Sequence, residues 1–340
     1  MKILIALLLL LGTGTLAPVA PRLLSETGYD DPRNRPFSPQ YPLWSDGASK
    51  RRWLRLPEGS TIDINNIDRW DFPVGTRFWK EFEFKGRKVE TRFLWKARED
   101  TWVFASYAWN DDQTAATLAP ETGIPNVAEV APGKRHSIPS IAECRSCHDS
   151  ARTEILGFTA LQLSTDRDPN ALHAEPLTPD MVTLRTLVDE SLVHPRRAEL
   201  VTAPPRINAA TPAARTALGY LSTNCGNCHN PESSIASFGL SLKHFVGEGT
   251  LDQCTPALAT TAGRRGHWVV PSNPDESRVI NPGRPDLSSL VQRVRSRRPS
   301  SQMPPIGTVL QDTKAVDLLT TWVQSDPEEW ARIVARCAGS

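Results

Sequence analysis

Two short stretches of this 340-residue sequence combine thiols and an imidazole at a fixed spacing. The first is Cys144-Arg-Ser-Cys147-His148, and Cys225-Gly-Asn-Cys228-His229 follows 81 residues later. Both have the Cys-x-x-Cys-His pattern that attaches c-type haem covalently. The two thiols form thioethers with the vinyl groups of one porphyrin, and the adjacent imidazole becomes the proximal ligand of the iron. The pentads therefore predict two covalent haems c, with His148 on the first iron and His229 on the second.

A pair of zinc-binding Cys-x-x-Cys knuckles is the alternative interpretation. Zinc ribbons usually place the second knuckle roughly 15–20 residues after the first, whereas the spacing here is 81 residues. Tetrahedral zinc also does not need a histidine directly after both second cysteines. The pattern favours haem.

Met303 is the strongest candidate for the distal ligand of the second iron. It is one of only three methionines, one of them the initiator, and it lies in the sequence Met303-Pro-Pro, 74 residues after His229. Prolines restrict the backbone, so a thioether in this loop is held against the iron at a small loss of conformational entropy. A methionine that only fills a gap is the alternative. An iron held by histidine and methionine is six-coordinate, which suits electron transfer.

The distal ligand of the first iron is less well defined. His173 lies five residues before an expected helix start at Thr178-Pro179, a place that corresponds to Met303 in the second region. We therefore rank His173 first among the candidates for the distal ligand of the first iron. The alternatives are Met181, His136 and His194. An iron with no distal side chain is a further alternative.

The first residues predict export. A charged start at Met1-Lys2, a short apolar run to Leu11 and small residues up to Ala17 have the order of a secretory signal peptide, which we place at residues 1–20. The apolar run is too short to span a bilayer, and no later stretch is long enough, so we expect no transmembrane segment in the mature chain. Thioether attachment takes place outside the cytoplasm, which agrees with a periplasmic or extracellular protein. A net charge of +1 gives no general attraction to nucleic acid.

Cys254 and Cys337 remain after the four cysteines of the pentads. In an oxidising compartment two leftover thiols favour a disulfide, which here would tie the C-terminal tail to a point 83 residues earlier. Two free buried thiols are the alternative.

The first half of the chain reads as β structure. Residues 21–40 lack periodicity and predict an extended lead-in. In residues 41–137, apolar and polar side chains alternate between short polar turns, which predicts an antiparallel β domain, sandwich-like in form. Seven of the ten tryptophans lie between Trp44 and Trp109. We interpret them as core residues, and an aromatic platform for a polymer is the alternative.

The second half reads as helical. Residues 138–205 form a first haem region, and residues 206–340 have the element order of a cytochrome c domain. In that domain a helix starting at Thr211-Pro212 leads into the second pentad, and a last packing helix is capped by Asp312. The predicted fold class is therefore α+β multidomain, with an antiparallel β domain followed by two mostly α-helical, cytochrome c-like haem regions. A cluster of arginines before Met303 is a candidate for haem propionates or for an acidic redox partner: Arg293, Arg295, Arg297 and Arg298.

Several further motifs accompany the pentads in chain order. They are Tyr41-Pro-Leu-Trp-Ser-Asp-Gly-Ala48, Trp70-Asp-Phe-Pro-Val-Gly-Thr76, Glu90-Thr-Arg-Phe-Leu94, Tyr107-Ala-Trp-Asn110, Leu218-Gly-Tyr-Leu-Ser-Thr-Asn-Cys225 and Gln302-Met-Pro-Pro-Ile-Gly-Thr308. On these motifs the chain resembles a poorly characterised family of secreted dihaem c-type cytochromes, in which a β domain precedes two haem-binding segments. The resemblance implies covalent haem at both pentads and Met303 on the second iron.

The expected function is one-electron transfer by an exported dihaem cytochrome that exchanges electrons with redox partner proteins. One alternative is a haem enzyme, peroxidase- or oxygenase-like, in which the first iron has an open position. The other is a redox module whose tryptophan-rich β domain binds a polymer or a partner protein.

Overall fold

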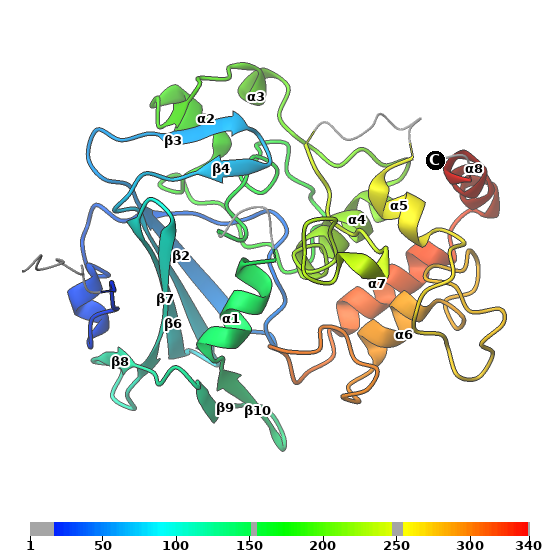
Figure 1. Cartoon of the computed structure of the whole chain (residues 1–340), viewed down its shortest axis with the longest axis horizontal. Coiled ribbons are helices and arrows are strands. Elements are labelled where there is room, and N and C mark those ends of the chain that lie inside the picture. The colour runs from blue at the N-terminus through cyan, green and yellow to red at the C-terminus, as the bar shows by residue number, and fades with distance from the viewer. Residues whose placement is uncertain (1–16, 151–154, 247–253, 339–340) are drawn as a thin grey trace, which may run out of the picture.

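The computed structural model describes residues 17–150, 155–246 and 254–338. It is a mixed α/β structure with a large antiparallel sheet region and several helices (Figure 1). The sheet region lies on one side, the helices from residue 212 onward lie on the other, and helix α1 (Ile141–His148) lies between them. All but the last four residues of the expected signal peptide fall outside the described residues.

Three sheets make up the β structure. The largest has the strand order β1-β2-β5-β6-β7-β8 with every pair antiparallel, β9 pairs with β10, and β3 pairs with both β4 and β11. The strands are β1 (Arg35–Pro36), β2 (Ser49–Arg55), β3 (Ile62–Asn66), β4 (Arg69–Asp71), β5 (Arg77–Phe84), β6 (Arg87–Arg98), β7 (Thr101–Trp109), β8 (Ala116–Leu118), β9 (Ile124–Ala131), β10 (Lys134–Ile138) and β11 (Val193–His194).

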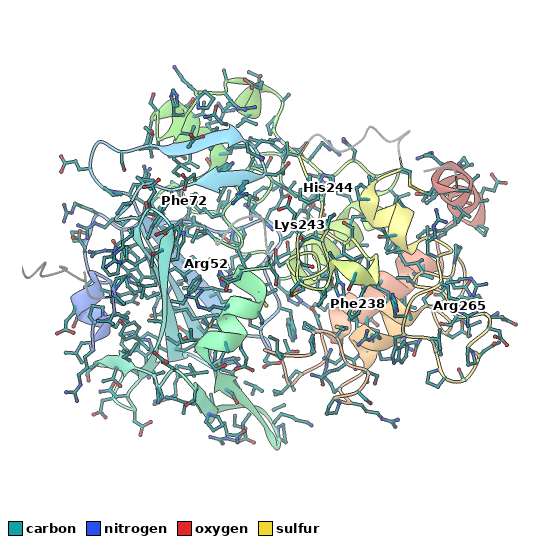
Figure 2. All side chains as sticks on the ribbon, viewed as in Figure 1. Arg52, Phe72, Phe238, Lys243, His244 and Arg265 are labelled. Carbon is teal, nitrogen blue, oxygen red and sulfur yellow. A yellow bond between two sulfur atoms is a disulfide. The ribbon has the colours of Figure 1, made fainter. Side chains whose placement is uncertain are left out.

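The period-two alternation of the sequence gives the large sheet two different faces. One face carries Trp79, Phe93 and Tyr107, which form a core with the short 3-10 helix η1 (Leu24–Thr27) of the lead-in. The opposite face packs against residues that follow the first pentad, among them Phe158. Phe72, between the large sheet and the β3–β4 hairpin, belongs to the same core (Figure 2). The predicted antiparallel β structure is confirmed.

The tryptophans between Trp44 and Trp109 are interior residues. Trp70, Trp79 and Trp102 are buried, the other four are partly buried, and none of the seven is exposed. Six of the seven lie in or against the hydrophobic cores of the sheet, which confirms their interpretation as packing residues.

Helices dominate the second half of the described chain. They are α1 (Ile141–His148), α2 (Leu184–Asp189), α3 (Glu199–Thr202), α4 (Pro212–Asn224), α5 (Pro256–Thr261), α6 (Ser289–Arg295), α7 (Thr313–Val323) and α8 (Pro327–Cys337), with a 3-10 turn η2 (Ala236–Phe238). The predicted caps of α4 and α7 are confirmed, because Thr211 accepts a hydrogen bond from the backbone N–H of Ala214 and Asp312 accepts one from that of Ala315. No helix within the described ranges is long and apolar enough to cross a membrane.

The expected helix start at Thr178 is wrong. Helix α2 begins at Leu184, because Thr183 forms a capping box with Thr186. The backbone N–H of Val182 is meanwhile bonded to the carbonyl of Pro36 in β1, which holds the preceding residues in an extended path along the sheet. A tertiary hydrogen bond has overridden a local capping signal.

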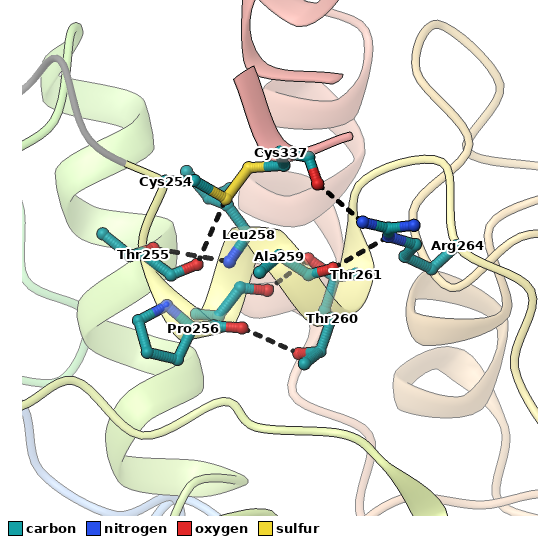
Figure 3. Close-up of a disulfide and its surroundings, with 10 residues drawn as sticks. Cys254, Thr255, Pro256, Leu258, Ala259, Thr260, Thr261, Arg264 and Cys337 are labelled. Atoms are coloured by element: carbon teal, nitrogen blue, oxygen red, sulfur yellow. Dashed lines mark hydrogen bonds between the residues drawn. A yellow bond between two sulfur atoms is a disulfide. The ribbon is translucent and has the colours of Figure 1, made fainter. Parts of the chain in front are cut away.

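The disulfide between Cys254 and Cys337 is confirmed (Figure 3). It joins Cys254, two residues before α5, to the last residue of α8. Arg264 reinforces the closure, since its Nη2 donates to the carbonyl of Cys337 at 2.6 Å and its Nε donates to that of Ala259.

The lead-in to the sheet also packs into the helical half. Tyr41 is part of the core formed by α4, α6, α7 and α8. Its ring lies directly on Gly219 of α4, where a Cβ atom would come within 2.1 Å of the ring. Only glycine allows this approach, which fixes residues 41–48 against the helix that precedes the second pentad.

Candidate functional site

The first pentad is positioned by a short capped helix. Ser140 accepts a hydrogen bond from the backbone N–H of Glu143, and Glu143 accepts one from that of Ser140, so α1 begins at Ile141. Cys144 and Cys147 are then three residues apart on one face of a helix. His148 ends the helix, and its ring contacts the ring of Phe104 on β7 at 5.1 Å between centroids.

The large sheet places two cationic side chains beside this helix, Arg92 on β6 and Lys80 on β5. Arg145 places its guanidinium over Phe104, 5.2 Å from the ring centroid. Burial raises the pKa of the Cys144 thiol, and nearby Arg92 on β6 acts against it. The pKa of Cys147 is lowered, first by a hydrogen bond with Cys228 and then, against burial, by Ser146, Arg92 and Lys80. Positive charge from Arg92 and Lys80 thus lies beside the first pentad and favours the thiolate of Cys147, whereas burial keeps Cys144 protonated.

The second pentad follows the end of α4 in a tight turn. The backbone N–H groups of Cys228 and His229 both donate to the carbonyl of Cys225. Gly226 is required here, because a Cβ atom would lie 2.5 Å from the carbonyl oxygen of Ser222 and 2.7 Å from Cα of Lys243. Burial raises the pKa of the Cys225 thiol to about 12. The ring of His229 forms no hydrogen bond to the described residues, and its Nδ1 atom is fully buried.

The fold brings the two pentads together. The Sγ atoms of Cys147 and Cys228 are 4.0 Å apart, although 81 residues separate them in the sequence. A second contact supports the junction, since Nδ2 of Asn230 donates to the carbonyl of Ser150 at 2.9 Å. This contact was not predicted, because it depends on how the helical half docks against the sheet.

The Met303 loop and His229 are both linked to Arg293 of helix α6. The backbone N–H of Met303 donates to the carbonyl of Arg293 at 2.9 Å. Burial lowers the pKa of His229, and the guanidinium of Arg293 lowers it further, so this residue also lies near the imidazole. Two residues predicted to bind one iron are therefore arranged around a single residue of α6.

Residues 44–46 close the other side of this loop. The indole nitrogen of Trp44 donates to the carbonyl of Leu310, and its backbone N–H donates to Oδ1 of Asn224, next to the second pentad. Asp46, with φ of 53°, accepts hydrogen bonds from the backbone N–H groups of Val309 and Leu310, both at 2.8 Å. Neither residue was predicted as functional, although both lie in the Tyr41–Ala48 motif.

His173, the expected distal ligand of the first iron, is tied to the second region. Its Nε2 lies 2.9 Å from Oδ2 of Asp312, the residue that caps α7, and its ring packs on Trp44 at 4.7 Å. It lines a cleft of about 410 Å³ with Lys50 and Glu175 at the edge of the sheet. Its ligation of the first iron stays a prediction, with one ring nitrogen engaged by a carboxylate.

The other candidates for that position have different surroundings. Both ring nitrogens of buried His136 face carboxylates, Nδ1 that of Asp46 at 3.5 Å and Nε2 that of Glu90 at 3.1 Å. Met181 is partly buried, and His194 lies exposed at the end of β11.

A polar chain connects the Met303 loop with the first pentad. It runs from Asp46 through His136 to Glu90, and then to Arg92, whose Nη2 is 2.6 Å from Oε1 of Glu90. Burial alone would raise the pKa of Glu90, but Arg92 and His136 lower it to about 2. The guanidinium of Arg92 lies near both Cys144 and Cys147, with which it interacts electrostatically.

Several buried polar atoms around the Met303 loop have no hydrogen-bond partner. They are Nδ1 of His229, Nε and Nη1 of Arg297, and Oγ1 of Thr308. Such atoms are rare in folded proteins, and each calls for a physical explanation. No group of three or more His, Cys, Asp or Glu side chains among the described residues is arranged to hold a metal ion.

Comparisons with protein-family models, curated proteins and solved structures each return no match for this chain.

Proposed function

We propose that this protein is an exported dihaem c-type cytochrome that transfers single electrons through two covalently attached haems. The observation that carries the proposal is the contact between the pentads, with Cys147 and Cys228 4.0 Å apart at sulfur. Cys147 and Cys228 would each hold one thioether of their own haem. Covalently bound haem would supply a reversible one-electron couple at each iron.

The residues of the second region fit a haem. His229 has an uncommitted imidazole, and the Met303 loop lies on the same residue of α6. Buried guanidinium nitrogens of Arg297 lack partners, as expected of a group that binds a propionate carboxylate. Asp46 and Trp44 hold the loop, and so limit how far the thioether of Met303 moves. A cytochrome c-like arrangement of α4, the loop and α7 is part of this proposal, as is a sandwich-like β domain.

The residues of the first region fit a haem on one side. α1 presents both thiols together, and Phe104 packs on the ring of His148, which restricts the imidazole. The positive charge of Arg92 and Lys80 beside the thiols would favour reduction of a haem held there, because nearby positive charge stabilises a reduced centre. Periplasmic localisation follows from the predicted signal peptide and belongs to the proposal, as do acidic redox partners for the arginines before Met303.

A haem enzyme with an open first iron is the second candidate. It is favoured by the hydrogen bonds that His136 and His173 already make to carboxylates. Carbon monoxide binding to the ferrous protein separates the two functions. An electron carrier with two six-coordinate irons gives no carbon monoxide complex, whereas an open first iron gives one per chain.

Haem content tests the proposal itself. The full chain is expressed with a haem-attachment system, and covalent haem per chain is measured as the pyridine haemochromogen. We expect two haems in the wild type, one in Cys144→Ala/Cys147→Ala, one in Cys225→Ala/Cys228→Ala, and none in the fourfold variant. The double substitution Cys254→Ser/Cys337→Ser is the matched control, because it removes two cysteines outside the pentads and keeps both haems. A wild type without covalent haem would overturn the proposed function.

A further inference from the structure

The sheet face beside the first pentad carries a row of polar side chains that electron transfer alone does not use. Lys80 on β5 pairs in register with Arg92 on β6, and Arg92 pairs with Ser106 on β7. Residues opposite one another in an antiparallel sheet project to the same face, about 4.8 Å apart per strand. Phe104, which contacts His148, is two residues before Ser106 on β7 and therefore lies on that face as well.

Each member of this row has hydrogen-bonding capacity to spare. Ser106 is 4% exposed, and its Oγ atom has no partner. Lys80 has no carboxylate within ion-pair distance in the described part of the chain, and its ammonium group lies over the ring of Phe82 at 4.8 Å. Arg92 uses Nε and Nη2 on Glu90, which leaves Nη1 without a hydrogen bond to any described residue.

The charge on this face is also unbalanced. Arg92 is compensated by Glu90 and Arg52 by Glu175, while Lys80 has no such partner. Burial lowers the pKa of Lys80, and Arg52 and Lys50 lower it further. Lys80 is partly buried, and a cation withdrawn from water without a partner is costly. A ligand that brings negative charge and hydrogen-bond acceptors would remove that cost, because the row offers donors and positive charge.

We propose that Lys80, Arg92 and Ser106 form a binding site for one oxyanion group beside the first pentad. The proposal deepens the proposed function and rests on it for one of two sources. The oxyanion is either a propionate carboxylate of the first haem or a small free oxyanion that enters next to it. Charge-assisted hydrogen bonds from an ammonium and a guanidinium suit a carboxylate in both cases.

The test compares Lys80→Met with two matched variants of the full, haem-loaded chain. Lys80→Arg keeps the positive charge. Lys96→Met removes a second lysine of the same sheet face, which is buried, pairs with Asp71 and lies four residues beyond Arg92 on β6. Sodium formate is the probe for a free oxyanion, titrated against sodium chloride at constant ionic strength. Binding is followed by the unfolding temperature and by the ferric Soret band, and a redox titration gives the potential of each haem.

If the site binds a free oxyanion, formate should change the unfolding temperature or the ferric Soret band of the wild type in a saturable way. The apparent dissociation constant for formate then rises about tenfold or more in Lys80→Met and stays near the wild-type value in both matched variants. If a haem propionate occupies the site, formate should have no saturable effect on either measurement. Instead the equilibrium constant for reducing one haem falls about tenfold in Lys80→Met, which corresponds to roughly 59 mV for one electron, and the other haem is unchanged.

The inference is overturned if Lys80→Met matches the wild type in both measurements, or if Lys96→Met produces the same changes. The unfolding temperature reads formate binding whether or not haem is attached, so the site is tested separately from the proposed function. Missing haem in the wild type overturns the proposed function and the propionate source. Two haems with no effect of Lys80→Met overturn the oxyanion site alone.

Discussion

The two pentads share one sequence pattern, but the chain surrounds them differently. The second lies at the end of a 13-residue helix, and α6, the Met303 loop and α7 follow it along the chain. The first lies on an eight-residue helix with no buried residues, and a β sheet packs beside it. Residues that follow the second pentad therefore supply most of its site, whereas the first site depends on the earlier strands β5, β6 and β7.

The lead-in to the sheet is the part of the chain that links the two sites. Asp46 bonds to the backbone after Met303 on one side and faces His136 on the other. From His136 the polar chain reaches Glu90 and Arg92 beside the first pentad. Polar contacts thus connect the two sites. Substitutions at one site will show how far the other site is independent of it.

Substitution of Met303 is expected to have the largest effect. Met303→Ala removes the thioether that we assign to the second iron, so the potential of one haem falls by on the order of 0.1 V, within the roughly 0.8 V range that axial ligands span. Carbon monoxide then binds to the ferrous form of that haem. Redox titration and ferrous spectra measure both changes, and the first haem keeps its potential.

Met181→Ala is the matched control for this substitution. Met181 is the other methionine of the described chain and an alternative ligand of the first iron. If Met181→Ala lowered the potential of one haem and allowed carbon monoxide to bind, while Met303→Ala did neither, the thioether ligand would be Met181 instead of Met303. Changes at both haems in Met303→Ala would show that the sites are coupled.

Loss of the disulfide is expected to act on stability and on the second region alone. Cys254→Ser/Cys337→Ser opens an 83-residue spacing, and the closure of loops of this size contributes about 2–4 kcal/mol. The free energy of unfolding, measured by denaturant titration, falls by that amount while both haem spectra persist. The disulfide anchors α8 to α5, far from α1 (Figure 1).

Chemical reduction of the disulfide in the wild type should lower the free energy of unfolding by the same amount. The same treatment should not change the free energy of unfolding of the double variant. A fall in the content of the first haem after loss of this disulfide would contradict the separation of the two regions.

The features that sequence alone predicted are those encoded by neighbouring residues. Cap residues such as Thr211 and Asp312 act within one turn, and the disulfide partners were the only cysteines left over. The pairing of His173 with Asp312 and the row of Lys80, Arg92 and Ser106 were not predicted. They depend on strand register and on docking between distant segments. Thr178 fails as a cap for the same reason, because a contact with β1 decides where α2 begins.

The smallest predicted effect concerns the pH dependence of the link between the sites. Burial alone would lower the pKa of His136, but the carboxylates of Asp46 and Glu90 outweigh burial and the opposing Arg92, and raise it above the ordinary value of 6.5. A raised pKa in the folded state stabilises the fold fully below the unfolded pKa, and the contribution is lost as pH rises through the folded value. His136→Gln should therefore cost about 1.5–3 kcal/mol near pH 5.5, the range for hydrogen bonds to charged groups, and clearly less near pH 9.

His194→Gln is the control, because His194 is exposed and its loss should leave stability unchanged across this range. Denaturant titrations of the three proteins at several pH values give the comparison. The rings of Phe82 and Phe84 pack on His136 from β5 and carry no charge, so Asp46, Glu90 and Arg92 set its titration. If His136→Gln lowered the free energy of unfolding by the same amount at all pH values, His136 would have a packing role. An altered spectrum of the first haem would instead make His136 its ligand, and the link between the sites would then run through the iron itself.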